Sequence, residues 1–151
     1  MRSGTWSDEK TAYQTKGLVM SKSPGHQQHP EHKVDETRVA RKVTASIDGK
    51  VIAESNDVIR VDEDGAPPRY YFPRDAVKAG QPERSTTTTK CPFKGTASYY
   101  TIKQDGRSYV DAIWSYEDPY DEHAALKGRL AFYDDKHPAI SVTIPSERGT
   151  R

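Results

Sequence analysis

The chain has 151 residues and a formal net charge of +1 at pH 7, with 23 Lys and Arg against 22 Asp and Glu. This length is about one domain, large enough to bury roughly two thirds of the surface of its unfolded chain. Basic residues are interspersed with acidic ones, which excludes a dedicated nucleic-acid binder because such proteins gather basic residues on one face.

No apolar run approaches the roughly 18 residues that a membrane-spanning helix needs. Residues 1–20 also lack the apolar core of a signal peptide. These absences predict a soluble, cytoplasmic protein without a membrane partner. A single cysteine excludes an internal disulfide framework and any Cys-x-x-Cys pair. The sequence indicates neither a cofactor nor an oligomeric state.

Both ends of the chain are polar and lack hydrophobic periodicity. We predict a flexible leader over residues 1–20 and a flexible tail over residues 145–151. Residues 21–40 are predicted to be an extension, containing Pro and His, that packs on the domain. Residues 41–144 are predicted to form a single β-rich domain, with its first strand near residue 40.

The extension contains three of the five histidines, His26, His29 and His32, in the stretch SPGHQQHPEH. Such spacing can place imidazoles near one metal ion. Pro24 and Pro30 break up the stretch, however, and the chain offers no pair of thiolate ligands. We therefore predict no metal site.

Alternating apolar and polar residues predict strands in the first half of the domain. KVTASIDGKVIAES is predicted to be a hairpin that turns at Asp48-Gly49, because this pair accepts positive φ angles. The β pattern continues in DVIRVDEDG, which turns at Asp64-Gly65. In APPRYYFP the prolines cannot donate ladder hydrogen bonds, so a short strand is limited to residues 70–72. One helical turn is expected in RDAVKAG.

The second half of the domain continues the series of strands. The threonine run at residues 86–89 is β-branched and predicts a strand that ends near Cys91. ASYYTIK, RSYVDAIWSY, RLAFYD and AISVTIP also fit strands, with a turn at Asp105-Gly106. EDPYDEHAALKGR predicts one short helix, which is capped by Asp118 and ended by Gly128.

Short strands with one or two brief helices predict a mainly β fold. Two antiparallel sheets would pack as a sandwich or as a partly open barrel. The sequence has no βαβ rhythm and no glycine-rich phosphate loop, which excludes the Rossmann and P-loop folds.

Several motifs in register resemble the family of domain of unknown function 427. They are YYFPR at residues 70–74, CPFKGTASY at residues 91–99 and WSYEDPY at residues 114–120, with SKSPGHQQHPEH upstream. The resemblance spans residues 21–144. It implies a single-domain, β-rich protein, common in bacteria and fungi, with a tent-like arrangement of two antiparallel sheets and no settled activity.

A label attached to this family hints at nucleotidyl transfer. That chemistry needs a Gly-Ser pair followed by paired aspartates that hold magnesium. Asp62 and Asp64 lack the Gly-Ser pair, and they lie at a predicted turn. The label therefore carries little weight for this chain.

Cys91 is the predicted catalytic residue. Lys90 precedes it and Lys94 follows three positions later, and nearby ammonium groups favour a thiolate that acts as a nucleophile or an oxidant sensor. The alternative is a small apolar residue packed at a strand end. The spacing fixes no histidine partner for Cys91. His123 and His137 are the candidates within the domain, and for His123, on the predicted helix, simple exposure is the alternative.

The motif CPFKG also has a structural interpretation. Pro92 fixes its φ angle and Gly95 permits a left-handed turn, so the motif can serve to reverse the chain. A turn of this kind also exposes backbone N–H groups to an anion. The two interpretations are compatible.

Aromatic and basic side chains predict a pocket for a small anionic metabolite, because cations hold an anion while rings line the walls. The predicted ligand-binding residues are Arg74, Lys94, Tyr71, Tyr99, Trp114, Tyr116 and Tyr120. Alternatively, the rings form the core, or they present the surface of a non-catalytic protein-interaction module. Nine tyrosines against three phenylalanines favour the pocket, because a hydroxyl is costly in a dry core. Whether the domain is an enzyme stays open.

Overall fold

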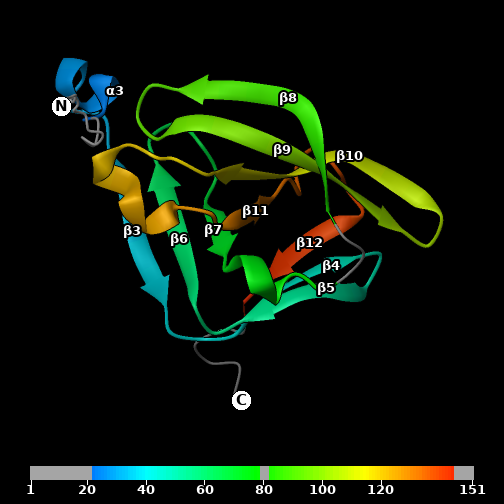
Figure 1. Cartoon of the computed structure of the whole chain (residues 1–151). Coiled ribbons are helices and arrows are strands. Elements are labelled where there is room, and N and C mark those ends of the chain that lie inside the picture. The colour runs from blue at the N-terminus through cyan, green and yellow to red at the C-terminus, as the bar shows by residue number, and fades with distance from the viewer. Residues whose placement is uncertain (1–21, 79–81, 145–151) are drawn as a thin grey trace, which may run out of the picture.

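Two antiparallel sheets build the fold in the computed structural model of the chain, which describes residues 22–78 and 82–144 (Figure 1). The predicted mainly β fold with two antiparallel sheets is confirmed, and within the described residues the sheets do not close into a barrel. The leader and tail predicted for residues 1–20 and 145–151 lie outside the described residues.

The larger sheet has seven strands in the order β3-β6-β7-β11-β10-β9-β8. In chain order they are β3 (Val34–Val39), β6 (Val58–Glu63), β7 (Arg69–Phe72), β8 (Glu83–Cys91), β9 (Gly95–Gln104), β10 (Arg107–Tyr116) and β11 (Leu130–Phe132). The smaller sheet has three strands in the order β12-β4-β5. They are β4 (Val43–Ile47), β5 (Lys50–Ser55) and β12 (Ile140–Thr143).

The two predicted hairpin turns are confirmed. Asp48 and Gly49 have φ angles of 49° and 80° between β4 and β5, and Asp105 and Gly106 have φ angles of 52° and 77° between β9 and β10. An Asp-Gly pair adopts such angles at little cost, and they match the twist of the strands that it joins. The hairpins therefore follow from local sequence.

The larger sheet begins earlier in the chain than predicted. β3 pairs with β6 along its whole length, from Val34 opposite Glu63 to Val39 opposite Val58. β3 is an edge strand in which exposed and half-buried residues are mixed, so its sequence lacks the apolar alternation that reveals a strand. The domain boundary predicted at residue 41 falls between β3 and β4.

Within residues 22–78 and 82–144, three short helices lie among the strands. α3 (Pro24–Gln28) follows Ser23, whose Oγ accepts a hydrogen bond from the His26 N–H at 3.1 Å. η1 (Arg74–Ala76) is the predicted single turn after β7. None of the helices in the described part of the chain is long and apolar enough to cross a membrane.

The third short helix, η2 (Asp121–Leu126), differs from the predicted helix. It is a 3₁₀ helix that follows Tyr120, and neither Asp118 nor another side chain caps it. The Tyr120 N–H donates to the Lys94 carbonyl at 3.0 Å, which keeps the chain extended before Asp121. A tertiary hydrogen bond thus overrides the local capping pattern.

The two faces of the larger sheet carry different hydrophobic clusters. The inner face packs against the smaller sheet, and its cluster includes Phe72, Ile113 and Phe132. The outer face carries a second cluster that includes Tyr71 and Trp114. Successive residues of a strand point to opposite faces, so β7 and β10 each supply both clusters.

Candidate ligand-binding site

A cavity of about 140 Å³ opens on the outer face of the larger sheet. Five of its lining residues are aromatic, namely Tyr71, Tyr99, Trp114, Tyr116 and Tyr133. Three are charged, namely Glu63, Arg69 and Lys94. The volume is close to that of an engineered apolar cavity that holds one benzene ring. The cavity therefore has aromatic walls and charged groups, and its volume suits a small organic molecule.

Two tyrosine hydroxyls can donate hydrogen bonds in this cavity. The Trp114 Nε1–H donates to the Tyr71 hydroxyl at 3.0 Å, which leaves the hydroxyl proton of Tyr71 for another acceptor. The Tyr116 hydroxyl makes no hydrogen bond with any of the described residues. Burial raises the pKa of both Tyr71 and Tyr116 above the ordinary value, so both hydroxyls keep their protons.

Lys94 supplies a buried ammonium group to the cavity. The residue is 7% exposed, and its Nζ lies 2.5 Å from Oε1 of Glu63 and 5.7 Å from the centre of the Tyr116 ring. The turn between β8 and β9 brings Lys94 to this position. The ammonium is thus held between a carboxylate and a ring face.

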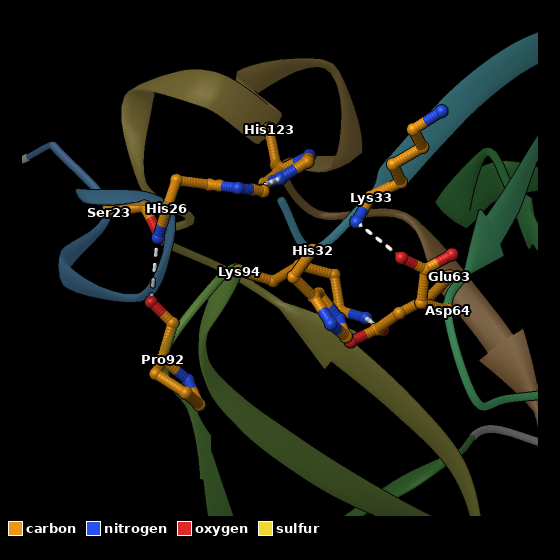
Figure 2. Close-up of polar contacts among 9 residues, drawn as sticks. All are labelled: Ser23, His26, His32, Lys33, Glu63, Asp64, Pro92, Lys94 and His123. Atoms are coloured by element: carbon orange, nitrogen blue, oxygen red, sulfur yellow. Dashed lines mark hydrogen bonds and ion pairs between the residues drawn. The ribbon is translucent and has the colours of Figure 1, made fainter. Parts of the chain in front are cut away.

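Glu63 binds both Lys94 and His32. Its Oε2 lies 3.0 Å from Nε2 of His32, and Figure 2 shows both side chains approaching the carboxylate. Burial alone would raise the pKa of Glu63, but the hydrogen bonds from Lys94 and His32 outweigh burial and place the pKa below its ordinary value. Because an ionised carboxylate only accepts hydrogen bonds, Nε2 of His32 carries a proton and donates it.

Arg69 forms a second cationic wall of the cavity. Its guanidinium donates to both oxygens of Asp135, at 3.0 and 3.2 Å. The guanidinium carbon also lies 5.1 Å from the ring centre of Trp114 and 5.4 Å from that of Tyr133. Arg69 is therefore stacked on rings and balanced by an acidic residue outside the cavity.

The structure brings together most of the residues predicted to bind a ligand. Lys94, Tyr71, Tyr99, Trp114 and Tyr116 all line the cavity. Tyr120 does not, because it lies beside Cys91 in a separate hollow.

Arg74 is the other predicted residue that lies away from the cavity. Its Nε donates to the Gly128 carbonyl at 3.1 Å, and its guanidinium lies over the ring of Tyr100, which belongs to the inner-face cluster. Arg74 also shares the carboxylate of Glu117 with the Tyr100 hydroxyl. Arg74 and Lys94 therefore do not converge.

Sequence reasoning missed three ionisable residues of this site. Arg69 stands two positions before Tyr71 in β7, and strand alternation places both on one face, so this residue had a local signal. Glu63 and His32 had none. Lys94 and His32 each reach Glu63 across 31 positions of the chain.

Cys91 lies half-buried at the end of β8, where it packs against the outer cluster. Lys90, Pro92 and Tyr120 line a hollow beside it. The ammonium of Lys94, the other lysine expected near the thiol, is bound by Glu63. The catalytic role of Cys91 stays a prediction.

His123 is buried, which excludes the alternative of simple exposure on the helix. It is 3% exposed, and its Nε2 lies 2.9 Å from Nε2 of His26 (Figure 2). Its Nδ1 lies 2.6 Å from Oε2 of Glu36. The Nδ1–H of His123 donates a hydrogen bond to the Glu36 carboxylate, so in the neutral ring Nε2 accepts a hydrogen bond from the Nε2–H of His26. These three residues, named here the histidine clasp, join α3, η2 and β3.

The three histidines of the extension take different partners. His26 pairs with His123, His32 with Glu63, and His29 with Glu31 at 3.6 Å. Among the described residues, no group of three His, Cys, Asp or Glu side chains could hold a metal ion.

The aspartates that a nucleotidyl transferase would need already have partners within the protein. Asp62 accepts hydrogen bonds from Nε of Arg60 at 3.0 and 3.1 Å. Asp64 accepts one from the backbone N–H of Lys33 at 2.9 Å (Figure 2). Both carboxylates thus stabilise β6 and the turn that follows it.

Comparison with known proteins identifies the family of the chain. No curated protein matches it. The model of the family described as "Domain of unknown function (DUF427)" matches residues 35–143, which extend from β3 to β12 and make up well over half of the chain. The resemblance seen in the sequence motifs is confirmed, and the chain belongs to this family of domains of unknown function.

Proposed function

We propose that this domain binds a small organic monoanion, such as a carboxylate, in the cavity on the outer face of the larger sheet. One observation carries the proposal: the buried ammonium of Lys94 lies in the same cavity as the protonated hydroxyls of Tyr71 and Tyr116. A carboxylate accepts several hydrogen bonds and balances a positive charge. An anion would therefore satisfy all three groups at once.

The arrangement favours an anion over a cation. Cations bind to aromatic pockets over free ring faces. In this cavity the protein's own cations lie over three of the five rings, with Arg69 over Trp114 and Tyr133 and Lys94 over Tyr116. A positively charged ligand would have to displace them.

The burial of the rings favours a small ligand over a protein partner. Tyr71, Trp114 and Tyr116 are 1%, 7% and 6% exposed. The large exposed hydrophobic residues of the described chain are Val51 and Val110, neither of which lines the cavity. A protein-interaction module would instead present a wide exposed apolar patch.

Three probes of similar size test the proposal, namely benzoate, benzamide and benzylammonium, which share a phenyl ring and differ in charge. We expect benzoate to raise the melting temperature, because ligand at about a hundred times its Kd stabilises the folded state by roughly 2.7 kcal/mol. Benzamide should bind more weakly and benzylammonium least. Lys94→Met should remove the benzoate shift, whereas Arg74→Ala, which lies away from the cavity, should keep it.

Two outcomes contradict the proposal. Tighter binding of benzylammonium than of benzoate would make the cavity a cation cage. Failure of benzoate, acetate and inorganic phosphate to bind would remove the anion site altogether.

A further inference from the structure

We infer that His32 sets how strongly the cavity attracts an anion, because His32 shares the carboxylate of Glu63 with Lys94. The inference rests on the proposed function and names a regulator of the same site. His32 is a positioning residue, since it acts on the ligand through Glu63 and Lys94.

The three residues form one continuous row of hydrogen bonds. Lys94 occupies Oε1 of Glu63 at 2.5 Å, and His32 occupies Oε2 at 3.0 Å. The imidazole of His32 stacks on Phe93, the residue before Lys94, with ring centres 4.2 Å apart and planes 18° apart. The aromatic stack fixes the imidazole plane, so its Nε2 stays directed at the carboxylate.

The charge of this row depends on the protonation of His32. With a neutral imidazole, the negative charge of Glu63 balances the ammonium of Lys94, and the row is neutral. With an imidazolium, the row carries one net positive charge beside the cavity. Low local polarity strengthens the attraction between that charge and an anion. Proton uptake at His32 should therefore tighten anion binding, and by linkage anion binding should promote proton uptake.

Other titratable groups also surround His32. Glu63 faces it from β6, Lys94 from the turn between β8 and β9, and His26 from α3, where His26 contacts the same Phe93 ring at 5.0 Å. Burial, followed by neighbouring His123, lowers the pKa of His26, which favours the neutral form of that residue.

The remaining charged neighbours are more distant or more exposed. His29 and Glu31 form an exposed ion pair in the same segment as His32. Asp64 is held by the Lys33 backbone N–H, and Arg69 stands on another wall of the cavity. His29 is therefore a matched control for a titrating imidazole that does not touch Glu63.

The first experiment measures the Kd of benzoate at pH 5.5 and at pH 8.0. We expect binding to be roughly tenfold tighter at pH 5.5, within the range typical of coupled sites. His32→Gln should remove this ratio, because a carboxamide donates to Glu63 at both pH values without titrating. His29→Gln should keep it.

A second variant protects the test against loss of folding in His32→Gln. Glu63→Gln removes the shared negative charge, so benzoate should bind more tightly at pH 8.0 than it binds to the unmodified protein. If Glu63→Gln instead binds benzoate no more tightly at pH 8.0, the charge of Glu63 does not govern anion binding, and the inference is wrong.

A ligand-free measurement tests whether Lys94 and His32 share Glu63. NMR follows the ring signals of His32 during a pH titration of the unmodified protein and of Lys94→Met. Removing the competing cation should move the midpoint for His32 upward, because Glu63 then interacts with the imidazolium alone. An unchanged midpoint would show that the carboxylate is not shared.

The possible failures are distinguishable. If neither benzoate nor inorganic phosphate binds at either pH, the proposed function fails and the inference fails with it. If benzoate binds but His32→Gln keeps the tenfold ratio, the inference alone is overturned and the anion site stands.

Discussion

His26 donates a hydrogen bond into the histidine clasp as a neutral imidazole. Burial and the nearby His123 lower its pKa from the ordinary value of 6.5. The unfolded chain therefore takes up a proton at this residue at a higher pH than the folded chain does. It follows that His26 supports folding fully above pH 6.5 and loses that contribution as the pH falls below this value.

The lowered pKa of His26 leads to a prediction of how the stability of the protein depends on pH. Between pH 7.5 and pH 5.5 the free energy of unfolding should fall more steeply for the unmodified protein than for His26→Gln, whose side chain does not titrate. Urea denaturation at the two pH values measures the difference. His29→Gln is the control and should follow the unmodified protein, so equal slopes for all three proteins would argue against the clasp as the source.

The thiol of Cys91 gives a second prediction at this scale. A thiolate favoured by lysine charge should react with iodoacetamide in the native protein at neutral pH, and Lys90→Ala should slow the labelling. Lys94→Met should have a smaller effect, because Glu63 already holds that ammonium. Labelling that requires denaturation would assign Cys91 to packing, and Cys91→Ser would then lower stability and leave benzoate binding intact.

At the scale of elements, α3 is attached by a close backbone approach. The Gly25 N–H and the Ser23 hydroxyl both donate to the Pro92 carbonyl, at 2.8 and 2.9 Å. A Cβ on Gly25 would lie 2.7 Å from the Pro92 oxygen and 2.8 Å from Cδ1 of Phe93. Only glycine fits against the turn in this position.

Gly25→Ala should therefore destabilise the protein. In an unconstrained helix the same change stabilises by about 0.5–1 kcal/mol, so the sign of the effect is diagnostic. We expect a lower melting temperature and faster proteolysis before β3. Gln27→Ala, at an exposed site of the same helix, is the control and should leave both nearly unchanged. A stabilising Gly25→Ala would mean that α3 does not dock.

The elements that sequence reasoning predicted are those with local causes. The hairpins at Asp48-Gly49 and Asp105-Gly106 follow from turn chemistry, and the strand at the threonine run follows from β-branching. β3 was missed, and the start and capping of η2 were mispredicted, because distant partners determine them. β3 is stabilised by its pairing with β6. η2 begins just after Tyr120, whose backbone N–H donates a hydrogen bond to the Lys94 carbonyl.

At the scale of the whole molecule, β3 completes the larger sheet and links it to the histidine clasp. A chain shortened to begin at residue 41 would expose the edge of β6 and remove both Glu36 and His26 from His123. We expect it to lose cooperative thermal unfolding, as measured by circular dichroism. A chain that begins at residue 22 should keep it. Cooperative unfolding of the shorter chain would support the domain boundary predicted at residue 41.

Only the part of the candidate site that depends on local sequence was predictable. Strand alternation groups Trp114 and Tyr116 on one face, so the aromatic walls are visible in the sequence. The row formed by Glu63, His32 and Lys94 is not visible in the sequence. These residues are far apart in the chain, and strand pairing and a turn bring them together. Arg74 was predicted to line the pocket, but its guanidinium contacts Tyr100 of the inner-face cluster, whereas Arg69 lines the cavity on the outer face.

The opposed faces of the larger sheet also make this domain a scaffold for redesign. Core packing depends on inward side chains such as Phe72 and Ile113, while the cavity depends on their outward neighbours Tyr71 and Trp114. A combinatorial library confined to outward positions would vary the shape and charge of the cavity while the packing between the sheets stays as it is. New ligands could thus be selected on a backbone whose main core is left untouched.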